Sequence, residues 1–265
     1  TRVKNQIERY LAGSSCHPIY VAHLKDEPRT MAKCYTGSTR VFCGSPLDNL
    51  IVQRAFLAPF YSLLSSHGYI WGSSLGINIH SQAAEFISEL ADFSENFLEG
   101  DYGGYDTSMP FCVAECVSSI VIRTLKHFGY NENALMVVRG LLTDNMYPYM
   151  SMLGDVFCAP GYQPSGKYAT AEDNCLRNLV LLMYFWESEF PEVGDFFDFV
   201  LPRTYGDDLL ASIRHPEFNC VTYAKFCKEV FGMDFTTSDK REIVDEFLVK
   251  RNVTFIKRRF IFDAA

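Results

Sequence analysis

Residues 196–213, with the sequence FFDFVLPRTYGDDLLASI, decide the fold. The first ten are rich in aromatic and other strand-favouring residues, Gly206-Asp207 is a turn signal, and 209–213 is apolar again. This pattern predicts a β-hairpin with Asp207 and Asp208 at its tip. A Gly-Asp-Asp triplet alone is weak evidence of function, because Gly and Asp favour ordinary exposed turns. Other segments must therefore decide what the hairpin does.

A second acidic pair lies upstream in DYGGYD at 101–106. A strand-like stretch ends at Asp101, and Asp106 follows five residues later. Mg²⁺ prefers oxygen ligands, and it is usually held by one or two carboxylates together with waters and phosphates. Asp101 at a strand end and Asp207 on an adjacent hairpin could bridge two ions roughly 3.5 to 4 Å apart. The sequence therefore predicts a two-metal site.

Between the two acidic segments, Ser165 and Gly166 precede a stretch, 170–187, that lacks Gly and Pro. We expect a long helix there. Thr170 and Asn174 are four residues apart, so they lie on one helical face, where both can hydrogen-bond a sugar. Capping of the helix N-terminus is the alternative role for Ser165 and Thr170.

Apolar periodicity and turn residues predict the remaining elements. They are helices at 46–64 and 110–128, a hairpin at 147–159, a helix at 216–231 closed by Gly232, and a final strand or hairpin at 253–262.

The chain has 265 residues, 48% hydrophobic and 21% charged, so it can bury a sizeable core. A net charge of −8 is unusual for a nucleic-acid enzyme, because lysine and arginine dominate phosphate binding. The charge is uneven, however: 1–40 carries seven bases and three acids, whereas 41–110 carries one base and eight acids. This gradient suits a protein that holds polyphosphate with one part and cations with another, although solvated faces also produce charge runs.

Several classes of protein are disfavoured. The longest apolar run, 179–186, is far shorter than the ~20 residues of a membrane span, and no targeting segment is visible. The nine cysteines form no C-x-x-C pair, so we expect reduced, mostly buried thiols rather than a zinc or redox site. Histidine spacing also suggests no metal site.

Taken together, these segments resemble the RNA-dependent RNA polymerases of picornaviruses and picorna-like viruses. D-x4-D at 101–106, S-G-x3-T-x3-N at 165–174 and Y-G-D-D at 205–208 resemble motifs A, B and C, in the family's order. The basic stretch 25–42 resembles motif F, 237–240 resembles the end of motif D, and 255–260 resembles motif E.

The resemblance implies an α+β right-hand fold, with an antiparallel palm sheet flanked by helices, plus fingers. It assigns 1–58 and 109–163 to the fingers, and 59–108 and 164–265 to the palm. Because few residues follow motif E, the resemblance also implies a fragment that lacks the thumb and part of the fingers.

The implied activity is template-directed transfer of nucleotides from ribonucleoside triphosphates to an RNA 3′-hydroxyl. It would use two Mg²⁺ or Mn²⁺ ions and serve viral genome replication in the host cytoplasm. The implied partners are template and primer RNA and the missing segments of the same polypeptide.

The resemblance also implies roles for individual residues. Asp101 and Asp207 would hold the metals, with Asp208 in support and Lys240 as the general acid. Nucleotide-binding residues would be Lys25, Arg29, Arg40, Asp106, Ser165, Thr170 and Asn174. RNA would contact Gly166, Lys257, Arg258 and Arg259. The alternative roles are a solvated basic loop at 25–40, a plain surface lysine at 240 and a charged edge strand at 257–259.

Two other functions compete. A reverse transcriptase shares the palm and its aspartates, but Asp106 and Asn174 argue against it, since a deoxynucleotide enzyme usually blocks the 2′-hydroxyl with a bulky group. The chain could also be a non-catalytic RNA-binding palm fragment of a viral polyprotein, which the short C-terminal end favours and the intact aspartates oppose.

Overall fold

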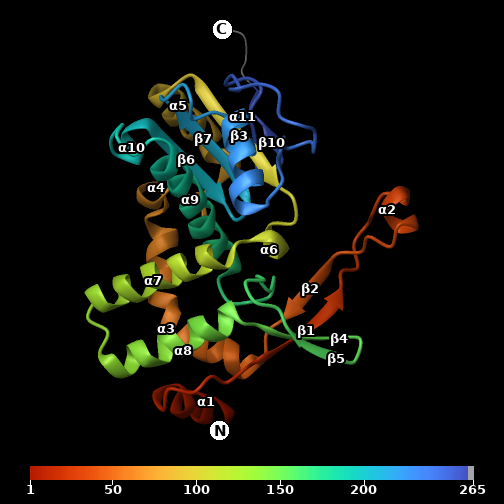
Figure 1. Cartoon of the computed structure of the whole chain (residues 1–265), viewed down its shortest axis with the longest axis vertical. Coiled ribbons are helices and arrows are strands. Elements are labelled where there is room, and N and C mark those ends of the chain that lie inside the picture. Colours follow the sequence, from red (N-terminus) through yellow and green to blue (C-terminus); the bar gives the residue numbers. More distant parts are fainter. Residues whose placement is uncertain (262–265) are drawn as a thin grey trace. The chain divides into compact units, whose positions relative to one another are not determined.

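The computed structural model describes residues 1–261, which form two compact units (Figure 1). Unit 1 comprises Thr1–Phe60 with Met109–Thr170, and unit 2 comprises Tyr61–Ser108 with Ala171–Ala265. Each unit is therefore built from two separate stretches of the sequence. Among the described residues, no helix combines the length and the apolar character that a membrane crossing requires.

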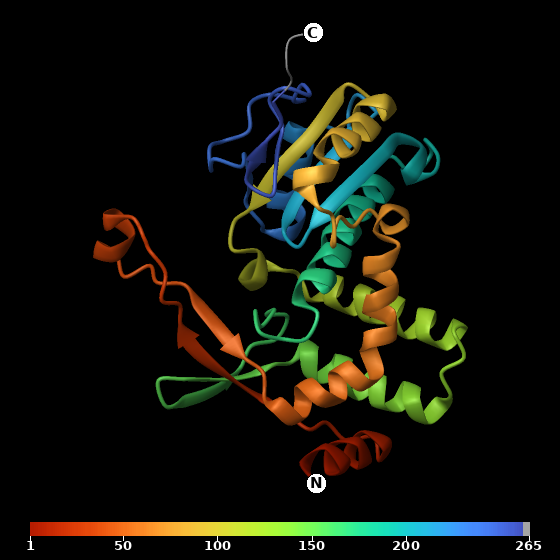
Figure 2. The same ribbon diagram turned by 180° about the vertical axis from the view of Figure 1, so that it is seen from behind.

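Unit 1 contains a four-stranded sheet in the order β2-β1-β4-β5 (Figure 2). Its strands are β1 (Ile19–Leu24), β2 (Val41–Gly44), β4 (Tyr149–Met152) and β5 (Asp155–Cys158). Only the β1–β4 pair is parallel among these neighbours. The helices are α1 (Arg2–Leu11), α2 (Met31–Tyr35), α7 (Phe111–His127) and α8 (Glu132–Met146), and α3 (Leu47–Ser66) begins in this unit.

A buried carboxylate ties α1 to α8 within unit 1. Asp144 accepts hydrogen bonds from the Tyr10 hydroxyl over 2.8 Å and from the backbone N–H of Cys16 over 3.0 Å. Burial and the Asp144 charge raise the pKa of Tyr10 above its usual range, so its hydroxyl stays protonated and available as a donor.

Unit 2 contains an antiparallel sheet in the order β6-β7-β3-β8. Its strands are β3 (Asn96–Tyr102), β6 (Val200–Tyr205), β7 (Asp208–Ile213) and β8 (Phe235–Thr236). The helices are α4 (Gly68–Trp71), α5 (Ile79–Phe93), α6 (Tyr105–Ser108), α9 (Thr170–Glu189, mostly in this unit), α10 (Phe196–Phe199) and α11 (Cys220–Phe226). A π-helix at Cys227–Phe231 and the short strands β9 (Thr254–Phe255) and β10 (Arg258–Arg259) complete it.

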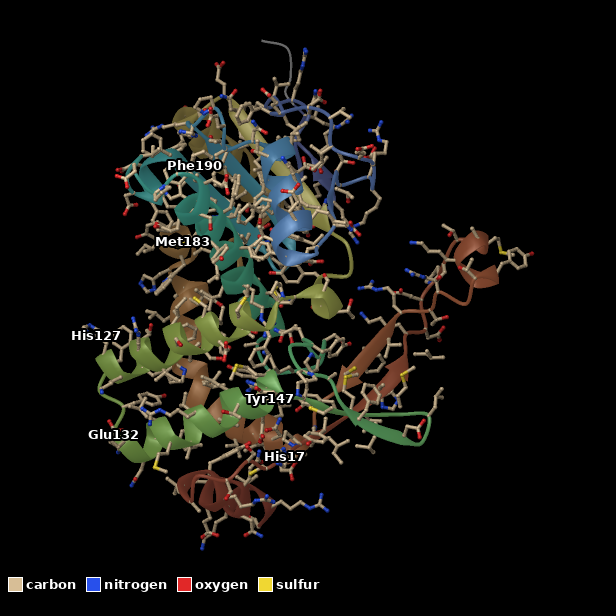
Figure 3. The ribbon with its side chains drawn as sticks, in the orientation of Figure 1. His17, His127, Glu132, Tyr147, Met183 and Phe190 are labelled. Carbon is tan, nitrogen blue, oxygen red and sulfur yellow. The ribbon has the colours of Figure 1, made fainter. Side chains whose placement is uncertain are left out.

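Aromatic side chains fill the core beside α9. Phe190 is labelled in Figure 3, and its ring centroid lies 5.3 Å from that of Trp186. The ring centroids of Phe185 and Phe218 are 4.8 Å apart. A second cluster packs α5 on the sheet, with Phe86 stacked on Phe255 at 5.2 Å. Because aromatic burial dominates core energetics, these contacts fix the sheet that carries the acidic residues.

Most predicted elements are confirmed: the helices at α3, α7 and α9, and the β4–β5 hairpin, whose turn is Leu153-Gly154. The antiparallel sheet that joins the hairpin to the strand of Asp101 is also confirmed. Residue 262, the end of the predicted last hairpin, lies outside the described residues.

Three expectations are wrong in detail. Residues 196–199 form α10 rather than strand, because the Asp195 side chain caps the backbone N–H of Phe197 over 2.9 Å. The helix expected from 216 begins at Cys220, where Asn219 forms a capping box with Thr222, and it ends as a π-helix before Gly232. Four of the nine cysteines are exposed and four are buried, so the thiols are not mostly buried.

Candidate catalytic site

The Gly206-Asp207 turn joins β6 and β7. Tyr205 pairs with Asp208, so only two residues form the loop, and Gly206 adopts φ +65°, which glycine tolerates without steric cost. Asp207 therefore lies at the tip of the hairpin. Asp208 is the first residue of β7 rather than a second tip residue.

Asp101 lies on the neighbouring strand of the same sheet. The last pair between β3 and β7 joins Gly100 to Leu209, which brings Asp101 next to the start of β7. Burial, followed by the charges of Asp207 and Asp101, raises the pKa of Asp208 to about 6. The three carboxylates thus share one region of negative charge, as a site for divalent cations requires.

Lys240 lies beside this acidic cluster. Its Nζ forms an ion pair with Oδ2 of Asp101, and its backbone has φ +66° in the loop after β8. The N–H of Lys240 donates to the carbonyl of Thr237 over 2.8 Å, which shapes that loop. The structure therefore brings the predicted general acid and a predicted metal ligand together.

Asp106 and Asn174 also meet within unit 2. Asn174 Nδ2 donates to Asp106 Oδ1 over 3.2 Å, and the Tyr105 hydroxyl donates to the Asn174 carbonyl over 2.9 Å. The Oδ1 of Asn174 is buried and has no hydrogen-bond partner within residues 1–261. A buried acceptor without a partner is costly, which is why such atoms often face a ligand.

Sequence reasoning missed the buried carboxylate Glu99. Its Oε2 accepts from the backbone N–H of Thr254 and its Oε1 from the Thr254 hydroxyl, each over 2.6 Å. Glu99 thereby fastens β9 to the strand that carries Asp101. The available signal was strand alternation, which places Glu99 and Asp101 two residues apart on one face.

The basic residues of the last hairpin are exposed. Lys257 occupies the turn between β9 and β10 with φ +57°, and Arg258 and Arg259 follow on β10. Lys257 lines a pocket of about 210 Å³ together with Asp101 and Asp208. Its charge opposes the rise in the pKa of Asp208, so it lies within electrostatic reach of the acidic cluster.

The predicted phosphate-binding residues belong to unit 1. Lys25 and Arg40 flank the β1–β2 pair, and the N–H of Lys25 donates to the carbonyl of Arg40 over 2.8 Å. Glu27 forms ion pairs with Arg29 at 3.3 Å and with Arg40 at 3.6 Å. One carboxylate thus holds two of the three bases close together.

The predicted loop residues 165–170 fold tightly within unit 1. Ser165 Oγ accepts from the N–H of Cys43 over 3.2 Å, and Gly166 forms a parallel bridge with Gly44. A Cβ on Gly166 would lie 2.2 Å from the Cys43 carbonyl oxygen, so only glycine fits without rearrangement. Thr170 Oγ1 donates to the carbonyls of residues 164 and 167, so its hydroxyl closes the loop rather than capping a backbone N–H.

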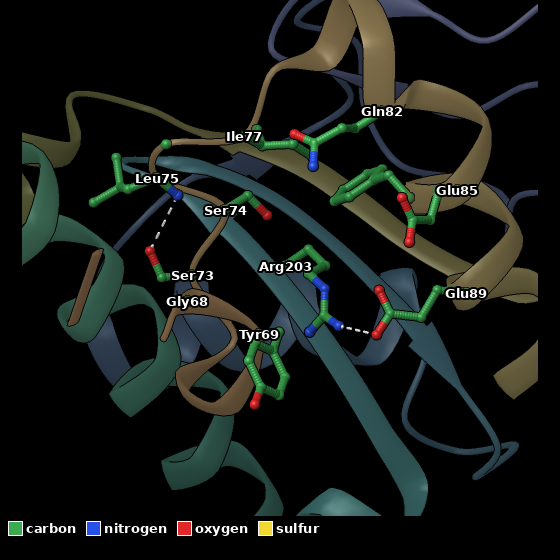
Figure 4. Close-up of a pocket in the computed structure, with 12 residues that line it drawn as sticks. Gly68, Tyr69, Ser73, Ser74, Leu75, Ile77, Gln82, Glu85, Glu89 and Arg203 are labelled. Carbon is green, nitrogen blue, oxygen red and sulfur yellow. Dashed lines mark hydrogen bonds and ion pairs between the residues drawn. The ribbon is translucent and has the colours of Figure 1, made fainter. Parts of the chain in front are cut away.

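A second pocket of unit 2, about 620 Å³, contains none of the predicted residues (Figure 4). Arg203 and Glu89 form an ion pair at its wall, with Nη2 and Oε1 2.6 Å apart. This pocket is therefore separate from the acidic cluster.

Within residues 1–261, no group of three or more His, Cys, Asp or Glu side chains is arranged to hold a metal ion. Magnesium, however, commonly takes only one or two carboxylates and fills its shell with waters and phosphates. The oxygen donors of Asp101, Asp207 and Asp208 fit such an ion, since burial and then the charges of Asp207 and Asp101 raise the pKa of Asp208.

Comparisons with known proteins agree on one family. The family model described as viral RNA-dependent RNA polymerase matches residues 1–263. The chain is 27% identical over 277 residues to the replicase polyprotein of cricket paralysis virus and covers 16% of it. It is 25% identical over 265 residues to the genome polyprotein of poliovirus type 3 and covers 11% of it. The chain thus spans only a small part of these relatives.

Among solved structures, the Sicinivirus 3Dpol RNA-dependent RNA polymerase matches with a TM-score of 0.83 and 21% identity. The match covers 99% of this chain and 54% of that one. This likeness shows the fold, a mixed α+β architecture with antiparallel sheets.

Proposed function

Since the chain belongs to the viral RNA-dependent RNA polymerase family, we propose that it carries the nucleotidyl-transfer centre of a picorna-like virus polymerase. The substrates are an RNA template, an RNA primer and ribonucleoside triphosphates. The primer 3′-oxygen bonds to the α-phosphorus as the bond to pyrophosphate breaks, and the hydroxyl proton is released. The observation that carries this proposal is the cluster of Asp101, Asp207 and Asp208 on adjacent strands of one antiparallel sheet.

We assign two Mg²⁺ or Mn²⁺ ions to Asp101 and Asp207, with Asp208 in a supporting electrostatic role. When bound, such ions activate the attacking hydroxyl and stabilise charge on the leaving pyrophosphate. The raised pKa of Asp208, caused first by burial and then by the charges of Asp207 and Asp101, supports this role, because a bound cation would offset the cost of ionising that carboxyl.

Selection of the ribose would rest on Asp106 and Asn174, with Ser165 and Thr170. The buried Oδ1 of Asn174, which has no hydrogen-bond partner in the described part of the chain, supports this role, since it can accept from a 2′-hydroxyl while Nδ2 remains bonded to Asp106. The 2′-hydroxyl is the group that distinguishes ribonucleotides from deoxynucleotides. A reverse transcriptase, which must exclude that group, is correspondingly disfavoured.

Charge on the triphosphate would be stabilised by Lys25, Arg29 and Arg40, and Lys240 would protonate the leaving pyrophosphate. The ion pair between Lys240 and Asp101 supports the latter role, because it keeps the ammonium group beside a proposed metal ligand. RNA would lie against Gly166, Lys257, Arg258 and Arg259, of which the last three are exposed and basic.

We propose that residues 1–58 and 109–163 form the fingers subdomain of a right-hand polymerase fold, and that residues 59–108 and 164–265 form its palm subdomain. The proposed setting is a replication complex in the host cytoplasm. A primer-extension assay with Mg²⁺ and ribonucleoside triphosphates tests the activity. Binding of RNA without any incorporation would instead support the non-catalytic alternative.

A further inference from the structure

One amide side chain, that of Asn178, contacts both segments that carry the proposed metal ligands. Asn178 is fully buried on α9. Its Nδ2 donates to the carbonyls of Asp207 over 3.3 Å and of Gly206 over 3.5 Å. Its Oδ1 accepts from the hydroxyl of Tyr102 over 3.0 Å. Tyr102 directly follows Asp101 on β3, so the amide bridges the two acidic segments.

A second tyrosine, Tyr223, extends this set of hydrogen bonds. The Tyr102 hydroxyl has one proton and gives it to Asn178, so in its 2.6 Å contact with the Tyr223 hydroxyl it is the acceptor. Tyr223, Tyr102 and Asn178 therefore form one ordered chain of donors that ends on the carbonyls of the turn.

A thiol supports the turn from the same helix. Cys175 Sγ accepts from the N–H of Gly206 over 3.1 Å and donates to the carbonyl of Thr204 over 3.6 Å. Cys175 and Asn178 are three residues apart on α9 and thus lie on one face. The helix consequently holds both the N–H and the carbonyl side of the turn. Of these two side chains, it is Asn178 that also bonds to β3, through Tyr102.

We propose that Asn178 is a positioning residue that sets the spacing between Asp101 and Asp207 for divalent cations, and that Tyr102 orients its amide. This inference rests on the proposed function of the two aspartates. A buried amide suits the task because it offers donors and an acceptor in one rigid plane. An ionised aspartate at position 178 would have the same shape as asparagine but no N–H to donate. One of its oxygens would then face the carbonyls of Gly206 and Asp207 without a hydrogen bond.

The test measures Mn²⁺ binding by electron paramagnetic resonance in the polymerase without nucleotide or RNA, beside kcat and KM in primer extension. Asn178→Asp and Tyr102→Phe are the variants, and Tyr61→Phe is the matched control. Tyr61 is a buried tyrosine whose hydroxyl donates to Asp173, five residues before Asn178 on the same helix. Melting temperatures report the purely structural cost of each change.

We expect Asn178→Asp to weaken Mn²⁺ binding and to lower kcat, each by about tenfold or more, with little change in the KM for primer-template. Tyr102→Phe should produce a smaller change in the same direction, and Tyr61→Phe should leave Mn²⁺ binding unchanged. If both variants bind Mn²⁺ and turn over like the parent, the inference is wrong. Tyr102→Phe keeps the test decisive if Asn178→Asp does not fold.

Failure of the proposed function gives a different result. In that case the parent itself binds no Mn²⁺ and incorporates no nucleotide, and Asp207→Asn changes neither measurement. If the parent is active, Asp207→Asn is inactive and Asn178→Asp resembles the parent, only the inference about Asn178 fails.

Discussion

Asn174 holds Asp106 through a 3.2 Å hydrogen bond from Nδ2 to Oδ1, while its own Oδ1 stays buried without a partner within residues 1–261. The bond to Asp106 fixes which end of the amide is the donor. The remaining acceptor is therefore oriented before any nucleotide binds. This arrangement suits recognition of a hydroxyl group, which can donate to that oxygen.

Asn174→Ala should reduce discrimination against deoxynucleotides. A hydrogen bond between neutral groups, such as the amide Oδ1 and a ribose hydroxyl, contributes about 0.5 to 1.5 kcal/mol, so the ratio of kcat/KM for ribonucleotide and deoxynucleotide should fall roughly 2- to 10-fold. Competing incorporation of the two substrates measures this ratio. Asn252→Ala, at an exposed position of unit 2, is the control. An unchanged ratio in Asn174→Ala would contradict the assignment.

Lys240→Leu should slow incorporation about 100-fold, because general acid catalysis typically contributes that much or more. It should also reduce the solvent isotope effect on the chemical step, which single-turnover kinetics in H₂O and D₂O would show. Lys228→Leu is a matched control, since Lys228 is an exposed lysine of the same unit that pairs with Asp234 at 2.7 Å. Equal rates and isotope effects in the parent and in Lys240→Leu would exclude the role.

Asp208→Asn should stabilise the metal-free protein in a pH-dependent way. The pKa of Asp208 is raised from 3.8 to about 6 in the folded state, so the fold favours the protonated form. The ionised Asp208 carboxylate lowers the free energy of unfolding. This destabilisation is absent below the pKa of Asp208 in the unfolded chain and complete above its pKa in the folded protein. The melting temperature of Asp208→Asn, measured with a chelator, should therefore exceed that of the parent by more at about pH 7 than at about pH 4.

Asp92→Asn, at an exposed position, controls for the general effect of losing a charge. If Asp208→Asn differs from the parent equally at both pH values, burial and the neighbouring carboxylates do not raise the pKa of Asp208 as described.

Gly166→Ala should destabilise unit 1, because its Cβ would lie 2.2 Å from the carbonyl oxygen of Cys43. Overpacking of this kind costs about 1 to 3 kcal/mol, which denaturant unfolding can measure. Gly44→Ala is the matched control, since its Cβ would lie 3.9 Å from the carbonyl oxygen of Val21, an ordinary van der Waals contact. Equal stability of the two variants would show that the loop moves to accept the methyl group.

Local sequence signals were sufficient to predict the hairpin at Gly206 and the long helix α9. The hairpin at Gly206 follows from a glycine with positive φ between two strand-forming runs, and α9 follows from a long stretch without Gly or Pro. The aromatic run 196–199 was ambiguous, because its residues suit a strand as well as a helix. The Asp195 side chain accepts a hydrogen bond from the N–H of Phe197, and this N-cap favours the helix.

Contacts between distant residues could not be predicted in this way. Glu99 and Thr254 are 155 residues apart in the sequence, and Tyr102 and Tyr223 are 121 apart, so no local sequence pattern predicts either contact. Motif spacing identified Asp101 and Asp207 but gave no sign that Asn178 lies between their segments. The approach of Asp101 to Asp207 depends on the register of β3 against β7, and the two pairs above depend on how β9 and α11 pack on β3, which only the folded chain determines.

The most direct test of the proposed activity is primer extension by Asp207→Asn in the presence of Mg²⁺. Asp198→Asn, a change of equal chemistry elsewhere in unit 2, is the control, and melting temperatures verify that both variants fold. The account predicts that Asp207→Asn retains its fold and RNA binding but incorporates no nucleotide, while Asp198→Asn extends the primer like the parent. Normal elongation by a folded Asp207→Asn variant would contradict it.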